Sequence, residues 1–174
     1  MARAFISAPI PAQVVVELRR LNRSQPEVQW ANPDQWTVTL QFLGHCDIGV
    51  IEESFLQIRG TSSTAVLGPR ISLLGRTNLV VPVRGLTDLA HQVQTSVEPH
   101  ESLKNQLSFV GHLTLGRLKD ANRAKLEGTP VSGSFVVTEL ELVQSVLGAG
   151  GPTHTTVNRL SLSPQFDYAN RPHF

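Results

Sequence analysis

Two short segments of the chain alternate polar and apolar residues in the same way. In residues 36–43 the polar positions are Thr37, Thr39 and Gln41, and the apolar positions are Val38, Leu40 and Phe42. In residues 109–118 the run His112-Leu113-Thr114-Leu115 repeats this order, with histidine where the first copy has Thr37. A period of two is typical of a β-strand with one buried face and one polar face. We therefore predict two related strands, each presenting a polar face.

Three further segments carry apolar residues at helical spacing. They are Pro11–Arg23, with Pro11 at the first helical position, residues 48–59, which Asp47 caps and Gly60 ends, and Leu86–Val97. These features are typical starts, stops and apolar stripes of amphipathic helices. A short helix is also expected near Asp120–Leu126.

The remaining apolar runs predict strands. They are Arg3–Ile10, a hairpin formed by Pro69–Leu74 and Leu79–Val83, and the final strands Ser134–Ser145 and Thr155–Leu162. Strands and helices mixed in this order, with one motif in each half, predict an α+β fold with an internal pseudo-repeat. We expect residues 1–174 to form a single domain of two lobes, with residues 164–174 as a tail.

Composition narrows the class of function. The 174 residues include 15 basic and 14 acidic ones, so the net charge of +1 gives no general attraction for polyanions, and any phosphate recognition must be local. Cys46 is the only cysteine and cannot form an internal disulfide. The histidines lack metal-ligand spacing, and no apolar run is long enough to span a membrane. We expect a cytoplasmic monomer without metal or cofactor.

His112 and Thr114 carry the candidate chemistry. Strand alternation places them on one face, about 6–7 Å apart, where both can reach one phosphate group. Histidine titrates near neutral pH and can therefore take or return a proton, whereas threonine adds an uncharged hydrogen bond. The simpler alternative is that both segments are ordinary half-buried strands with polar outer faces.

Several segments together resemble a known family. RAFISAPIP at the start, Trp30, TVTLQFLG, SFVGHLTLGR and THTTVNRLSL are similar, in order and spacing, to the LigT-like RNA 2′,3′-cyclic phosphodiesterases of the two-histidine phosphoesterase superfamily. The resemblance implies a bilobal fold of two antiparallel sheets with outer helices, and a central cleft with one HxTx motif from each lobe. It implies metal-free hydrolysis of RNA 2′,3′-cyclic phosphate ends to 2′-phosphates and, for some members, 2′-5′ RNA ligation.

The resemblance also implies roles for individual residues. His112 matches the histidine that activates water, and Thr39 and Thr114 match the threonines that hold phosphate. Thr37 stands where the family has its first histidine, the general acid. Arg117 matches an arginine that neutralises phosphate charge. Regular alternation places it on the face opposite His112, so a bulge or a twist at the end of the strand would be needed to bring it to the cleft.

Other residues are candidates for a missing acid or for binding the substrate. His154 lies in a segment where the family has an aromatic residue near its site, and His100 lies in the loop Glu98–Gln106 before the second motif. Aromatic residues that could stack a nucleobase, or simply fill the core, are Phe5, Trp30, Trp36 and Phe109. The glycine-rich run at 147–153 suggests either a phosphate loop or, more simply, a turn.

The sequence leaves three functions open. The first is an RNA 2′,3′-cyclic phosphodiesterase that uses His112 and is impaired at Thr37. The second is a noncatalytic binder of RNA ends or cyclic phosphates, and the third is an interaction domain with a vestigial cleft.

Overall fold

The strands of the protein form one long antiparallel sheet. The computed structural model describes residues 2–98, 108–119, 125–148 and 151–165. Within these residues, ten strands are present: β1 (Ala2–Pro9), β2 (Val28–Trp30), β3 (Thr37–Cys46), β4 (Ser63–Leu67), β5 (Ser72–Leu74), β6 (Asn78–Arg84), β7 (His112–Leu118), β8 (Gly133–Val137), β9 (Glu139–Gly148) and β10 (Gly151–Ser161). A 3-10 turn at Pro33–Gln35 leads into β3.

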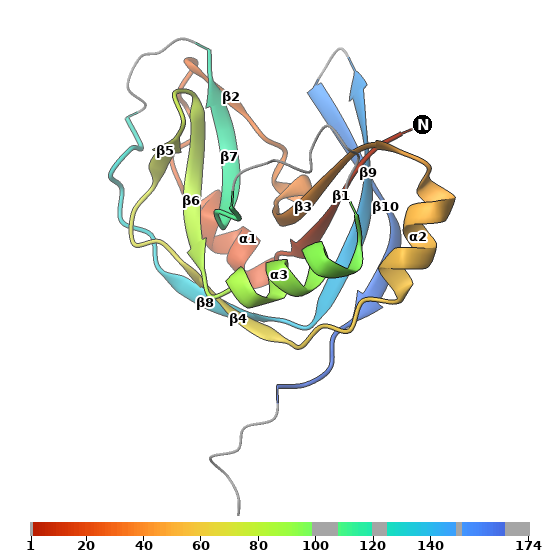
Figure 1. Ribbon diagram of the computed structural model, residues 1–174. Coiled ribbons are helices and arrows are strands. Elements are labelled where there is room, and N and C mark those ends of the chain that lie inside the picture. The colour runs from red at the N-terminus through yellow and green to blue at the C-terminus, as the bar shows by residue number, and fades with distance from the viewer. Residues whose placement is uncertain (1, 99–107, 120–124, 149–150, 166–174) are drawn as a thin grey trace, which may run out of the picture.

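The order of the strands brings the two motif strands together. The order is β10-β9-β1-β3-β7-β6-β4-β8, while β2 pairs with β7 and β5 pairs with β6. Figure 1 shows these strands curving into an open half-barrel. The two halves meet where β3 and β7 run antiparallel, with Val38 opposite Leu113. The predicted α+β fold with related halves is confirmed.

Three α-helices lie within the described residues: α1 (Ala12–Arg19), α2 (Ile48–Leu56) and α3 (Thr87–Ser96). The predicted cap of α2 is confirmed, because Asp47 Oδ1 accepts a hydrogen bond from the Gly49 amide at 3.0 Å. Pro11 is the extended N-cap of α1, one position before the predicted one. The predicted helix at Asp120–Leu126 lies mostly outside the described residues, as do positions 166–174 of the predicted tail.

The predicted strand Ser134–Ser145 is wrong, because the chain changes position in the sheet at Thr138. Strand β8 pairs with β4 in one half, whereas β9 pairs with β1 and β10 in the other. Strand β4 itself was not predicted. The predicted hairpin is confirmed, with Leu74 of β5 opposite Asn78 of β6.

One face of the sheet packs into a core that both halves share. This core includes Leu40 and Leu113 from the motif strands, together with Leu18 of α1 and Leu89 of α3. Among the described residues, three apolar ones are buried without joining this core, namely Phe5, Val80 and Val143. Their register places them on the opposite face, which also carries the polar residues of the motif strands. No helix in the described residues combines the length and apolarity needed to cross a membrane.

Candidate active site

Four polar side chains from the two motif strands lie on one face of the sheet. Val38 and Leu113 oppose each other and point into the core with no exposed surface. Extending this antiparallel register by one residue in each direction sets Thr37 opposite Thr114, and Thr39 opposite His112. Directly opposed residues share a face and have Cβ atoms about 4.5–5.5 Å apart. The motifs therefore form one compact group on adjacent strands, with all four residues half-buried.

The His112 ring is oriented for proton acceptance. Its Nδ1 atom lies 2.7 Å from the carbonyl oxygen of Val110. Because a carbonyl oxygen can only accept, Nδ1 carries the hydrogen of the neutral ring. The Nε2 atom then keeps its lone pair, so His112 can take a proton from a bound water through Nε2.

The three threonines of the group differ in their hydrogen bonding. Thr37 Oγ1 donates to the carbonyl oxygen of Ala8 at 2.7 Å. A hydroxyl has one hydrogen, so Thr37 presents only acceptor lone pairs to a ligand. The hydroxyls of Thr39 and Thr114 make no hydrogen bond within the described residues. Thr39 and Thr114 are therefore the hydroxyls available to donate to a phosphate oxygen.

A β-bulge in β7 brings Arg117 to the same face. On the neighbouring strand β6, Val80 pairs with Thr114 and Leu79 pairs with Gly116, so β7 has one extra residue between them. Beyond this bulge Arg117 pairs with Asn78, which shares its face of β6 with Val80. The expectation from regular alternation, that Arg117 faces away from His112, is therefore wrong, because the bulge reverses the parity of the strand.

The other motif strand contains the corresponding bulge. Ser7 pairs with Thr39 and Ile6 pairs with Gln41, so the extra residue lies immediately after Thr39. Gln41 is therefore buried, and its amide donates to the Val97 carbonyl at 2.7 Å, while Phe42 is 53% exposed. The predicted faces of Gln41 and Phe42 are reversed. The first seven residues of β3 and the seven residues of β7 have the same order of buried and more exposed positions.

Three aromatic rings extend along the same face from Phe42. The Phe42 and Phe5 ring centroids are 6.2 Å apart, and the Phe5 and His154 centroids are 5.0 Å apart in an edge-on arrangement. His154 is half-buried, and burial lowers its pKa below the ordinary value of 6.5. Its imidazole is therefore neutral at pH 7. Exposed Phe42 is the member of this row that is most accessible to a ligand.

His154 does not lie beside Thr37. It pairs with Ser145, which in turn pairs with Arg3 of β1, whereas Thr37 pairs with Pro9. Six residues of strand separate these two levels, about 20 Å. The structure therefore places His154 with the aromatic residues and away from Thr37.

The remaining sequence candidates lie elsewhere. His100 falls outside the described residues, and His91, a further histidine that belongs to neither motif, is exposed on α3. Trp30 and Trp36 pack with the core, and the Arg23 guanidinium lies 5.5 and 5.8 Å from their ring centroids. Phe109 also packs against the core.

The glycine-rich run joins β9 to β10, with Gly148 opposite Gly151. This pairing favours the turn over a phosphate loop, although residues 149–150 lie outside the described ones.

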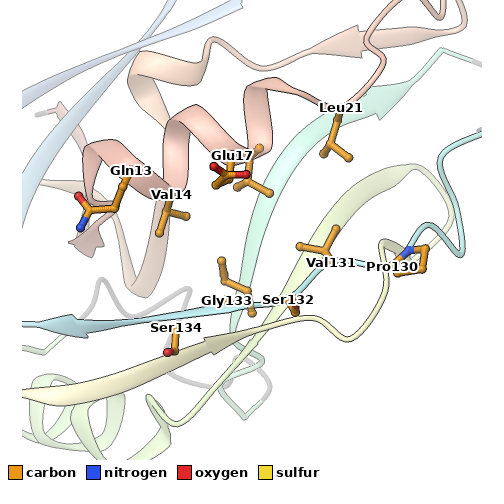
Figure 2. A pocket seen from close by; sticks show the side chains of 11 residues that line it. Gln13, Val14, Glu17, Leu21, Pro130, Val131, Ser132, Gly133 and Ser134 are labelled. Carbon is orange, nitrogen blue, oxygen red and sulfur yellow. The ribbon is translucent and has the colours of Figure 1, made fainter.

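A cavity of about 390 Å³ lies away from this group of residues. Figure 2 shows that it is formed by side chains of α1, including Gln13 and Glu17, and by the segment from Pro130 to Ser134. Glu17, its one carboxylate, is paired with Arg20 at 2.9 Å, and no histidine lines it. An apolar cavity with one negative charge is poorly suited to a phosphate, so we place the candidate site on the motif strands.

Several solved structures share this fold. E. coli LigT complexed with 3′-AMP is 24% identical with a TM-score of 0.73, over 92% of this chain and 98% of that chain. A protein described as a phosphoesterase is 23% identical with a TM-score of 0.72, over 93% and 98%. TT0787 of Thermus thermophilus is 21% identical with a TM-score of 0.73, over 94% and 100%. No family model and no curated protein matches the sequence. The comparisons establish the fold.

Proposed function

We propose that the protein is a phosphoesterase of the two-histidine type that acts on RNA 2′,3′-cyclic phosphate ends. The observation that carries this proposal is the pairing of a proton-accepting His112 Nε2 with the donor hydroxyls of Thr39 and Thr114 on one face. The fold supports it, because the similar structures include a phosphoesterase and a LigT that binds 3′-AMP.

In the proposed reaction, His112 removes a proton from water as the water oxygen attacks the phosphorus atom. The bond from phosphorus to the 3′ oxygen breaks, and the 3′ oxygen takes up a proton, leaving a 2′-phosphate. Thr39 and Thr114 donate to the phosphoryl oxygens, and Arg117 supplies positive charge. If the 5′-hydroxyl of a second RNA replaces water, its oxygen attacks the same phosphorus atom and the bond to the 3′ oxygen again breaks. The phosphorus atom stays on the 2′ oxygen, so the two RNA ends are joined by a 2′-5′ phosphodiester.

The leaving oxygen has no protein acid at the position that faces Thr114. Thr37 donates its only hydrogen to Ala8, and His154 is both distant and neutral. Within the described residues no other acid is found beside Thr37, so the proposed source of the proton is solvent water. General acid catalysis typically contributes about 10²–10⁴ in rate, so we expect hydrolysis to be slow. For the same reason, a noncatalytic binder of cyclic phosphates is the second candidate function.

The aromatic row would bind the base of the substrate. Phe42 is exposed. Its ring centroid lies 6.2 Å from that of Phe5, which in turn lies 5.0 Å from that of His154. Aromatic side chains stack nucleobases with little preference for sequence, at about 1–3 kcal/mol per base. We therefore place the base of the terminal nucleotide against Phe42.

The test is turnover of adenosine 2′,3′-cyclic phosphate by the wild-type chain and by two variants, with the product position read by phosphorus NMR. We expect slow formation of the 2′-phosphate by the wild type. His112→Ala should lower the rate at least about 100-fold, and Thr37→His should raise it about 10²–10⁴-fold by restoring an acid. His91→Ala, on exposed α3, is the matched control and should leave the rate unchanged.

The outcomes separate the two candidate functions. Hydrolysis that survives His112→Ala would contradict the role of His112. A wild-type chain that binds the cyclic phosphate but leaves it intact, combined with an active Thr37→His variant, would identify a binder. If neither protein binds or hydrolyses the ligand, both proposals are wrong.

A further inference from the structure

We infer that Gln29, Arg117 and Asn78 form a second subsite, which binds the phosphodiester on the 5′ side of the terminal nucleotide. This inference rests on the proposed function and extends it, because it makes an RNA chain, and not a free mononucleotide, the preferred substrate. Neither Gln29 nor Asn78 belongs to the motifs.

The three side chains form a row across three strands. Arg117 of β7 is paired directly with Gln29 of β2 on one side and with Asn78 of β6 on the other. Directly paired residues share a face of the sheet with Cβ atoms about 4.5–5.5 Å apart. The bulge places Arg117 on the face of His112 and Thr114, so Gln29 and Asn78 lie on that face as well. Gln29 and Arg117 are exposed, and Asn78 is half-buried.

Backbone contacts hold both neighbours of Arg117 in place. The Leu118 amide donates to the Thr77 carbonyl at 2.8 Å, which ties β7 to the start of β6. The Lys119 amide donates to the Glu27 carbonyl at 2.9 Å, which ties β7 to the start of β2. The row is therefore set by the sheet and does not depend on a ligand.

The chemistry of the row suits a phosphodiester. It offers one guanidinium and two carboxamides, so hydrogen-bond donors can converge on an anion, and it contains no carboxylate to repel one. Within the described residues, Arg117 makes no ion pair or hydrogen bond through its side chain. The guanidinium charge is therefore free to meet a ligand.

The position of the row indicates which phosphate it meets. Phe42 lies three residues beyond Thr39 and Arg117 lies three residues beyond Thr114, each about 7–10 Å along its strand. Because β3 and β7 are antiparallel, these residues lie on opposite sides of the motif group. In a nucleoside 2′,3′-cyclic phosphate, the base on C1′ and the 5′ group on C4′ likewise leave the ribose at opposite ends, one on each side of the ring oxygen. With the base against Phe42, the 5′ phosphodiester points toward Arg117.

The test compares adenosine 2′,3′-cyclic phosphate with the dinucleotide ApA ending in the same cyclic phosphate. For the wild-type chain we expect kcat/KM to be roughly tenfold or more higher for the dinucleotide. A hydrogen bond to a charged group typically contributes enough free energy to change kcat/KM by this factor. The double variant Gln29→Ala/Asn78→Ala should remove most of this preference. Arg117→Ala, which also removes positive charge from the cyclic phosphate, should lower kcat/KM for both substrates, and more for the dinucleotide. Gln57→Ala, an exposed amide at the end of α2, is the matched control and should preserve it.

Each outcome decides the inference separately from the proposed function. Equal losses on both substrates in the Gln29→Ala/Asn78→Ala variant, or no loss on the dinucleotide, would overturn the second subsite while leaving the hydrolase intact. If the wild type hydrolyses neither compound, the proposed hydrolysis fails, and the subsite is judged by calorimetric binding of the two intact ligands. Tighter binding of the dinucleotide that is lost in the double variant would support it, and equal or absent binding would overturn it.

Discussion

Ser7 and His154 hold polar atoms that find no hydrogen-bond partner within the described chain. They are Ser7 Oγ, on a residue with no exposed surface, and His154 Nδ1. A buried polar group without a partner typically costs about 1–3 kcal/mol, so such groups are few in folded proteins. Both residues lie on the face that carries the motif group, since Ser7 pairs with Thr39 and His154 contacts Phe5. Five further buried side-chain atoms without a partner lie elsewhere in the described chain, so this cost is not confined to the candidate site.

The burial of His154 makes a prediction for the pH dependence of stability. Burial lowers the pKa of His154 in the folded state, so between that pKa and the unfolded value near 6.5 the unfolded chain binds more protons. The contribution of neutral His154 to stability is present above pH 6.5 and is lost as the pH falls. His154→Phe keeps a ring against Phe5 but cannot titrate. Urea unfolding at pH 7.5 and pH 5.5 should show that the wild type loses more stability on acidification than this variant.

A second variant separates titration from packing in this experiment. His154→Gln removes both the titrating group and the ring that Phe5 contacts at 5.0 Å. It should share the weaker pH dependence of His154→Phe, but with lower stability at both pH values. The same acid loss in all three proteins would show that His154 does not cause it.

At the scale of elements, each motif strand contains a bulge immediately after its second threonine, and β3 contains a second one further along, between Phe42 and Gly44. The bulge after the threonine turns Arg117 toward His112 in β7 and turns Phe42 outward in β3. The same type of bulge therefore exposes a different side chain in each half, a guanidinium in one and an aromatic ring in the other. Because of this difference, the two ends of the nearly symmetric site offer a ligand different contacts.

Gly116 allows β2 to approach β7 beside this bulge. A Cβ atom at Gly116 would lie 2.7 Å from the Gln29 carbonyl oxygen and 2.8 Å from Val28 Cγ1. Gly116→Ala should therefore force β2 outward and lower the free energy of unfolding by about 1–3 kcal/mol. It should also lower the dinucleotide preference, because Gln29 would leave the row. Urea denaturation and the two-substrate assay measure the two effects.

Gly148 is the matched control for this substitution. It also lies in a strand, but the nearest atom to its added Cβ is 3.7 Å away. Gly148→Ala should change stability by no more than about 0.5 kcal/mol. If Gly116→Ala changed the free energy of unfolding equally little, the close approach of β2 to β7 would not be needed to keep Gln29 beside Arg117.

The bulges also mark where prediction from sequence fails. Alternation correctly groups Thr37 with Thr39, and His112 with Thr114, because these pairs precede the extra residue. Beyond it, alternation assigns Gln41, Phe42 and Arg117 to the wrong faces. A bulge depends on how the neighbouring strand pairs, which a local pattern does not contain. Gln29 and Asn78 carried no signal for the same reason, since only pairing across strands places them beside Arg117.

At the scale of the whole molecule, the chain connects the two halves more than once. The turn at Thr138 carries it from β8 in one half to β9 in the other, a crossing that the continuous apolar pattern of residues 134–145 concealed. The mixed α+β class and the internal repeat were predictable from element order. The strand order was not, because it depends on contacts between segments distant in sequence.

The shared core predicts that the two halves unfold together. Leu113 has no exposed surface and pairs with Val38 where the halves meet, in a core that includes residues of both. We expect one cooperative urea transition, with Trp30 and Trp36 fluorescence coinciding with far-UV circular dichroism. Leu113→Ala should lower the free energy of unfolding by about 2–5 kcal/mol and move both signals equally, because the cavity would lie in a core common to both halves. Separate transitions for the two signals, or a shift of only one of them, would show that the halves are independent domains and that the junction of β3 and β7 holds the site together only weakly.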